Sequence, residues 1–254
     1  MSDVSSALSG PASPPSPAAA PLPEGRAGTG RRLTTLYVYE APVRLWHWVN
    51  ALSIVVLCIT GYLIGSPLPT LSGEPSAHYL MGTIRFLHFA AGYIFAVGFL
   101  GRIAWAFLGN RYSRELFTFP FWRKSFWRGL FVEIQWYMFL KTRPLKFVGH
   151  NPLAQLFLFW VMVVGSLFMI GTGFALYSEG TGMGSWQDTL FGWIIPLLGG
   201  SLAVHTLHHL GMWVIILFVL IHVYSVVRED IMSRQSMISA ITNGYRSFRD
   251  DDPD

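Results

Sequence analysis

The sequence predicts an all-α integral membrane protein, a bundle of four transmembrane helices with an added amphipathic helix on the cytoplasmic side. Three observations lead to this prediction. The 254 residues are 52% hydrophobic and 13% charged, whereas an average soluble domain is about 25% charged. Four apolar segments reach the ~20 residues that cross a bilayer. The basic residues are concentrated in the segments on one side of these spans.

We divide the chain into three parts. Residues 1–36 are rich in Pro, Ala, Ser and Gly without periodicity, so we expect a disordered cytoplasmic tail. Residues 37–230 form the transmembrane domain, and residues 231–254 form a cytoplasmic C-terminal tail. The expected spans are about 45–65, 84–108, 153–176 and 204–227.

The basic residues predict the orientation. Four Lys and Arg lie in the tail through Arg44, eight in residues 109–150 and four from Arg228 onward. With Arg102 near the same end of the second span, 17 of the 18 basic residues fall on one side, and only Arg85 does not. The positive-inside rule then places both termini in the cytoplasm. The net charge of +4 is therefore a topology signal and does not indicate a nucleic-acid surface.

Two connecting segments contain apolar stretches. Residues 121–140 mix aromatic and basic side chains, which is typical of a helix lying in the inner membrane interface. Residues 177–203 contain several aromatic and aliphatic side chains, but no apolar run among them is long enough to span the membrane. We expect this second segment to rest on the membrane or against a partner.

The last span contains several histidines inside an apolar sequence. Ionisable residues at membrane depth are costly and indicate function. His208 and His222 are 14 residues apart, so they share a helix face and lie about 21 Å apart along the axis. His205 and His209 are out of phase with that face. Two histidines on one face at opposite ends favour two stacked metal cofactors, most simply two haems.

Two earlier spans supply partners at matching depths. His47 lies near the cytoplasmic end of the first span and His88 near the periplasmic end of the second. Residues at the same depth can share a site, so His88 pairs with His208 on the periplasmic side and His47 pairs with His222 on the cytoplasmic side. Two bis-imidazole sites suit six-coordinate b haems in electron transfer, because no axial position stays open.

Further residues have the spacing expected of haem contacts. Gly61 and Arg102 each follow a ligand candidate by 14 residues. The missing side chain of Gly61 would let a porphyrin approach closely. Arg44 and Arg85 each precede a ligand candidate by three residues, within reach on one helix face, and Arg suits haem propionates. For Arg44, a positive-inside flank is an equal alternative.

Some other classes of site and protein are excluded or disfavoured. The single cysteine, Cys58, cannot hold an iron–sulfur cluster, a cysteine-ligated zinc or an internal disulfide. A transporter or proton channel using histidine relays predicts acidic residues within the spans. None of the four spans contains Asp or Glu, which counts against that alternative.

Two histidine motifs are recognisable in the chain. They are RLWHWV at 44–49 with Thr60-Gly61, and HTLHHL at 205–210 with Trp213, Phe218 and His222. Together they resemble the signatures of the b-type cytochrome subunit of membrane-bound nickel–iron hydrogenases, over roughly residues 35–245. The resemblance implies a subunit that anchors the hydrogenase large (nickel–iron) and small (iron–sulfur) subunits to the periplasmic face of the bacterial inner membrane.

The resemblance also implies the roles of particular residues. It gives His47, His88, His208 and His222 as the haem ligands, with electrons passing from the iron–sulfur small subunit to quinone. The chain has no four-cysteine nickel site, so we do not expect it to be an enzyme by itself.

A second, related family extends the prediction. The chain is similar to the cytochrome b subunit of membrane formate dehydrogenases, in which quinone binds by an Asn at a helix start. Asn151 is the matching quinone-site candidate, with His150 and Gln155 as neighbours. A cytochrome b subunit of another periplasmic dehydrogenase, such as formate dehydrogenase, is therefore the alternative function.

Overall fold

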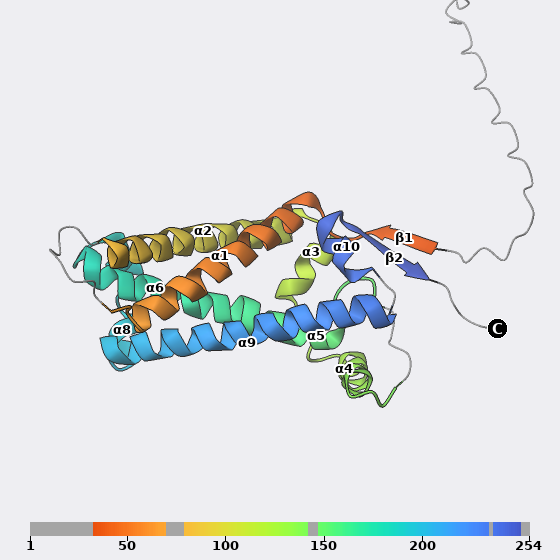
Figure 1. Ribbon diagram of the computed structural model, residues 1–254. Coiled ribbons are helices and arrows are strands. Elements are labelled where there is room, and N and C mark those ends of the chain that lie inside the picture. The colour runs from red at the N-terminus through yellow and green to blue at the C-terminus, as the bar shows by residue number, and fades with distance from the viewer. Residues whose placement is uncertain (1–32, 70–78, 142–146, 234–235, 250–254) are drawn as a thin grey trace, which may run out of the picture.

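The computed structural model describes residues 33–69, 79–141, 147–233 and 236–249, and its main feature is four long helices (Figure 1). Each of the four is long and apolar enough to cross a membrane, as predicted, and each begins slightly before the predicted residue. The elements in chain order are β1 (Leu33–Tyr37), α1 (Ala41–Gly65), α2 (Leu80–Leu108), α3 (Arg111–Arg114), η2 (Glu115–Phe117), α4 (Lys124–Tyr137), α5 (Pro152–Phe157), η3 (Leu158–Val164), α6 (Gly165–Thr181), α7 (Trp186–Phe191), α8 (Ile194–Leu197), α9 (Ser201–Ser233), α10 (Met237–Thr242) and β2 (Tyr245–Arg249).

The third long helix is continuous from Pro152 to Thr181 and is made of α5, η3 and α6. It begins at Asn151, whose side chain accepts a hydrogen bond from the Ala154 backbone N–H, while Pro152 occupies the first turn. Both features are helix-start signals. Its middle segment, η3, is π-helical.

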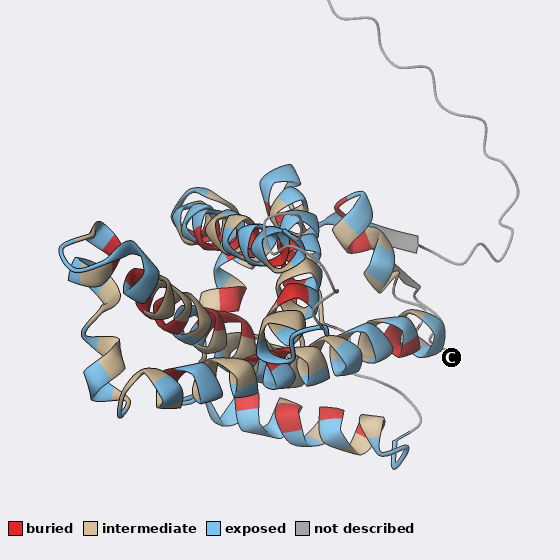
Figure 2. Ribbon diagram, turned by 60° about the vertical axis from the view of Figure 1, so that its left-hand side comes forward, coloured by how far each residue is buried: buried red, intermediate tan, exposed pale blue. Residues whose placement is uncertain are grey.

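The interior between the long helices is apolar. Ile54, Phe95, Phe99, Met162 and Ile215 belong to one buried cluster that joins α1, α2, η3 and α9. Most of the outward-facing helix surface is exposed (Figure 2) and includes many large apolar side chains. An apolar exterior of this extent suits contact with lipid.

The two ends of the bundle differ (Figure 1). The loop end carries α7 and α8, between the end of α6 and the start of α9. The sheet end carries β1, β2, α3, α4 and α10. Here Glu40 Oε2 accepts hydrogen bonds of 3.0 Å from Trp105 Nε1 and from the Asn110 backbone N–H, which ties the start of α1 to the end of α2.

Parts of the two predicted tails are folded. Residues 33–37, of which 33–36 were assigned to the disordered tail, form β1, which pairs antiparallel with β2 in register Leu33↔Arg249 to Tyr37↔Tyr245. The prediction of disorder was wrong for residues 33–36, because the pairing joins residues from opposite ends of the sequence. Residues 1–32, 234–235 and 250–254 of the predicted tails lie outside the described residues.

The predicted amphipathic helix is present as α4. Its inner face buries Phe126, Leu130 and Trp136, whereas Trp127 and Phe131 are exposed. In Figure 1, α4 is seen nearly end-on, across the direction of the long helices. That direction suits a helix lying along a membrane surface.

Candidate functional site

Four histidines from three long helices meet in two pairs. His88 on α2 faces His208 on α9, with ring centroids 6.5 Å apart and ring planes at 73°. His47 on α1 faces His222 on α9, with centroids 6.4 Å apart and planes at 51°. The structure thus brings together the two pairs expected from depth, the first toward the loop end and the second toward the sheet end.

These separations fit a metal held between two imidazoles. A ligating nitrogen lies about 2.0–2.1 Å from its metal and about 1.1 Å from its own ring centroid, so two rings on one metal have centroids about 6.3 Å apart. Within the described residues, no group of three or more His, Cys, Asp or Glu side chains is placed to hold a metal ion. Two imidazoles alone therefore suit an iron whose other four ligands come from a macrocycle, as in haem.

Two threonines orient the first pair. Thr60 Oγ1 lies 2.8 Å from His88 Nδ1, and Thr172 Oγ1 lies 2.8 Å from His208 Nδ1. Each hydroxyl also donates to the carbonyl oxygen four residues back, at 2.6 Å for Thr60 and 2.7 Å for Thr172. Because each hydroxyl has one proton and gives it to a carbonyl, Nδ1 must donate to the hydroxyl. The proton is thereby held on Nδ1, and Nε2 is free to ligate.

Each threonine is followed by a glycine that lies against the same ring. A Cβ added to Gly61 would stand 3.3 Å from His88 Cε1, and one added to Gly173 would stand 3.3 Å from His208 Cε1. Both positions are tighter than ordinary van der Waals contact. The Thr-Gly pairs on α1 and α6 therefore place and orient the two imidazoles in the same way.

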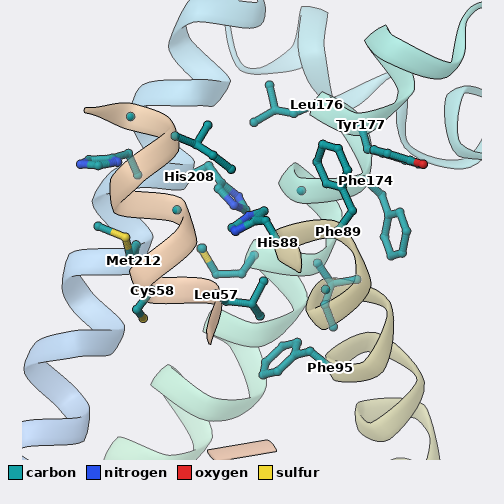
Figure 3. A pocket seen from close by; sticks show the side chains of 18 of the residues that line it. Leu57, Cys58, His88, Phe89, Phe95, Phe174, Leu176, Tyr177, His208 and Met212 are labelled. Carbon is teal, nitrogen blue, oxygen red and sulfur yellow. The ribbon is translucent and has the colours of Figure 1, made fainter. Parts of the chain in front are cut away.

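A large cavity surrounds this first pair. It has a volume of about 780 Å³ and is lined by residues of α1, α2, α6 and α9, and Figure 3 shows the His88 and His208 rings turned toward each other inside it. The volume lies in the ~300–1,000 Å³ range of small-molecule and cofactor sites. Its lining is mainly apolar, and its polar groups include Arg85, His205 and His209.

Several buried nitrogen atoms toward the sheet end lack hydrogen-bond partners among the described residues. His47 Nδ1, Trp46 Nε1, and Nε and Nη1 of Arg102 are buried and have no hydrogen-bond partner among the described residues. Arg102 lies over the Trp46 ring at 5.5 Å and donates through Nη2 to the Ser113 carbonyl at 2.6 Å. Buried polar atoms without partners are rare in proteins and often indicate a missing ion or ligand. The guanidinium donors fit an anionic group such as a haem propionate.

Arg44 lies against the turn that precedes β2. It lies at the sheet end, where its guanidinium contacts Gly244 beside β2, and its Nη1 is buried without a hydrogen-bond partner in the described part of the chain. The contact ties α1 to the turn before β2. An unsatisfied donor is compatible with either role expected for Arg44.

His150, one of the quinone-site candidates, belongs to a hydrogen-bonded chain at the sheet end. Its Nδ1 lies 3.1 Å from Glu115 Oε2 and its Nε2 lies 3.3 Å from the Tyr39 hydroxyl. The side chains of His150 and Glu115 are 24% and 27% exposed. The chain therefore connects a buried region with groups that solvent can reach.

The other two quinone-site candidates have structural roles. The Asn151 side chain caps α5 and its Nδ2 donates to Glu133 Oε2 at 3.1 Å. Gln155 Nε2 donates to the Thr118 carbonyl at 2.7 Å. These bonds hold α5 against α4 and against the end of η2. A ligand using Asn151 or Gln155 would have to share or replace them.

Thr60, Thr172 and Gly173 were not predicted from the sequence as partners of the histidines. Thr60 stood in a recognised motif without a role, and Thr172 lay outside both motifs. The dipeptide Thr-Gly occurs in the first and third spans, at 60–61 and 172–173. That repetition was the signal in the sequence from which the contacts with the histidines could have been predicted.

Comparison with known proteins gives a consistent result. Residues 38–244 match the family model described as prokaryotic cytochrome b561. A protein of Azotobacter vinelandii is 62% identical over 88% of this chain and 93% of its own length. Proteins of Cupriavidus necator and Escherichia coli K12 are 58% and 51% identical, over 89% and 84% of this chain and 93% and 91% of their own lengths. The first two are named "Probable Ni/Fe-hydrogenase B-type cytochrome subunit", and the third "Probable Ni/Fe-hydrogenase 1 B-type cytochrome subunit".

Proposed function

The chain belongs to the prokaryotic cytochrome b561 family, and we propose that it anchors a nickel–iron hydrogenase to the membrane and passes its electrons, through two b haems, to quinone. It is a multi-pass membrane protein and a b-type cytochrome with a role in electron transfer. The names of its relatives support hydrogenase as the partner. The partner subunits would be the iron–sulfur small subunit and the nickel–iron large subunit.

The observation that supports the proposal most strongly is the presence of two facing pairs of imidazoles, His88 with His208 and His47 with His222. Centroid separations of 6.5 and 6.4 Å suit two six-coordinate irons, and one helix, α9, supplies a ligand to each. When bound, the two haems supply one-electron redox chemistry. His88 and His208 would hold one, and His47 and His222 the other.

Basic side chains at each site suit the propionate groups. At the loop end, Arg85 lines the cavity of the first pair together with His205 and His209. At the sheet end, Arg102 and Arg44 have buried guanidinium nitrogens without partners among the described residues. A buried cation without an anion is costly. Arg102 donates to the Ser113 carbonyl through Nη2, and a propionate would supply acceptors for its Nε and Nη1.

The arrangement of charge supports a direction across the membrane. Arg44, Arg102, Arg228 and Arg246 all lie at the sheet end, and Arg85 lies at the loop end. By the positive-inside rule the sheet end faces the cytoplasm. The loop end, with the His88/His208 pair, would then meet the hydrogenase in the periplasm of a bacterium, and both termini would lie in the cytoplasm.

We place quinone reduction at the sheet end. Reduction of a quinone takes up protons as well as electrons, and the chain of Glu115, His150 and Tyr39 offers a route for them. Desolvation raises the pKa of the Tyr39 phenol, and the nearby Glu115 carboxylate raises it further. Tyr39 therefore keeps its proton at neutral pH and can donate to His150. His150, Asn151 and Gln155 are the candidate contacts for quinone.

Purification of the membrane complex tests the proposal. The chain should copurify with the two hydrogenase subunits. Hydrogen gas should reduce its b haems, as followed by their absorbance spectrum, only when those subunits are present. A complex that instead contains another dehydrogenase, with haem reduced by formate and not by hydrogen, would replace hydrogenase as the partner. A purified complex without b-type absorbance would refute the proposal altogether.

A further inference from the structure

We propose that Thr60 and Thr172 are positioning residues that lower the midpoint potential of the haem between His88 and His208. This inference rests on the proposed function, since it concerns a haem held by these ligands. Neither threonine would touch the iron. Each acts through the imidazole that it binds, by the hydrogen bonds of 2.8 Å to Nδ1.

The direction of the effect follows from the position of the proton. Each hydroxyl gives its proton to the backbone carbonyl of Val56 or Phe168, so its oxygen can only accept from Nδ1. An imidazole that donates from Nδ1 becomes a more basic ligand at Nε2. A more basic ligand stabilises ferric over ferrous iron, and hydrogen bonds to the axial ligands are among the factors that set haem potentials.

The second site lacks this arrangement. Nδ1 of His47 is buried and has no hydrogen-bond partner in the described part of the chain. His222 instead stacks on Phe218, with centroids 5.7 Å apart and ring planes at 14°. The two threonine bonds are thus specific to the His88/His208 site. They add to the driving force for electrons to move from that site to the His47/His222 site.

Their burial makes the bonds persistent. The residues Thr60 and Thr172 are 5% and 1% exposed, so water does not compete for the hydroxyls. The backbone carbonyls that accept from them are held within α1 and α6. The position of the proton on each imidazole is therefore fixed by the fold and does not depend on a mobile side chain.

Redox titration of the purified complex tests the inference with four variants. Thr60→Val and Thr172→Val remove one hydroxyl each with little change of shape, and Thr60→Ser keeps it. Thr206→Val is the matched control, because Thr206 also lines the cavity and also donates to the carbonyl four residues back, at 2.9 Å. Thr206 hydrogen-bonds to no histidine among the described residues. The site is identified as the haem lost in His208→Ala.

We expect each Thr→Val change at positions 60 and 172 to raise the midpoint of that haem. The expected change is about tenfold in the ratio of reduced to oxidised haem at fixed potential, which corresponds to 59 mV for one electron. The other haem should keep its midpoint. Thr60→Ser and Thr206→Val should titrate like the unmodified chain.

Several outcomes would overturn the inference. Unchanged midpoints in both Val variants would show that the hydroxyls have no electronic effect. Loss of this haem in both Thr60→Val and Thr60→Ser would show that residue 60 acts through its shape. If Thr60→Val loses this haem and Thr60→Ser keeps it, the midpoint in Thr172→Val decides: an increase supports the inference, and an unchanged midpoint overturns it. The proposed function fails separately, if the unmodified chain shows no b-type haem.

Discussion

Gly61 lies directly against the ring of His88, so closely that a Cβ on Gly61 would stand 3.3 Å from His88 Cε1. The two residues come from different helices, α1 and α2. Because Gly61 has no side chain, the His88 imidazole packs directly against the backbone of α1. Close approach between the ring and the α1 backbone therefore depends on glycine.

A larger residue at position 61 should displace His88. We expect Gly61→Leu to lose the haem of the His88/His208 site and to keep the other, as measured by haem content per chain. Gly101→Leu is the control, because a Cβ on Gly101 of α2 has no atom within 4 Å among the described residues. Equal haem content in the two variants would contradict the packing role of Gly61.

The pairing of the histidines was predictable from sequence because it depends only on depth. A span of known direction gives each residue a height, and ligands at one height must come from different helices. The partners Thr60 and Thr172 were not predictable in this way. Their contacts with His88 and His208 depend on how each helix is rotated about its axis, which the even apolar surface of a membrane helix does not define.

The folded ends of the chain illustrate a second limit. Residues 33–37 form a strand only because β2 lies beside them, with Thr35 opposite Ser247. Five residues without a regular alternation of apolar and polar side chains give no clear strand pattern. Contacts between such distant segments are not encoded in the local sequence, although the four apolar spans are.

Arg102 should be needed for the haem at the sheet end. We expect Arg102→Met to weaken retention of the His47/His222 haem during detergent washing, because the cation that would face a propionate is lost. Arg102→Lys should retain more haem than Arg102→Met, since it keeps the charge but not the planar donors. The haem of the other site serves as the internal control. Equal retention of both haems in Arg102→Met would exclude this role.

Glu115 should affect quinone reduction and not haem binding. Glu115→Gln removes the carboxylate that lies 3.1 Å from His150 Nδ1. We expect slower quinone reduction by the hydrogen-reduced complex, because a neutral amide does not accept and pass on a proton as a carboxylate does. Haem content and reduction of the haems by hydrogen should be unchanged. A quinone reduction rate equal to that of the unmodified complex would remove Glu115 from the proton route.

Asn151 should contribute to stability through its cap. Asn151→Ala removes the acceptor for the Ala154 N–H, which lies 2.7 Å away, and loss of such a cap costs about 1 kcal/mol. Asn151→Ser keeps an oxygen at this position and should restore most of that stability. Thermal unfolding in detergent measures both. If Asn151→Ser restores stability but not quinone reduction, the amide also has a role at the quinone site.

The ratio of haem to chain shows whether the four histidines hold two haems. The unmodified chain should bind two b haems, and His208→Ala and His222→Ala should each retain one, with different midpoints. His205→Ala should retain two, because the His205 ring is hydrogen-bonded through Nδ1 to the Ser201 carbonyl at 3.0 Å and does not face His88. An unchanged ratio in both His208→Ala and His222→Ala would exclude His208 and His222 as haem ligands.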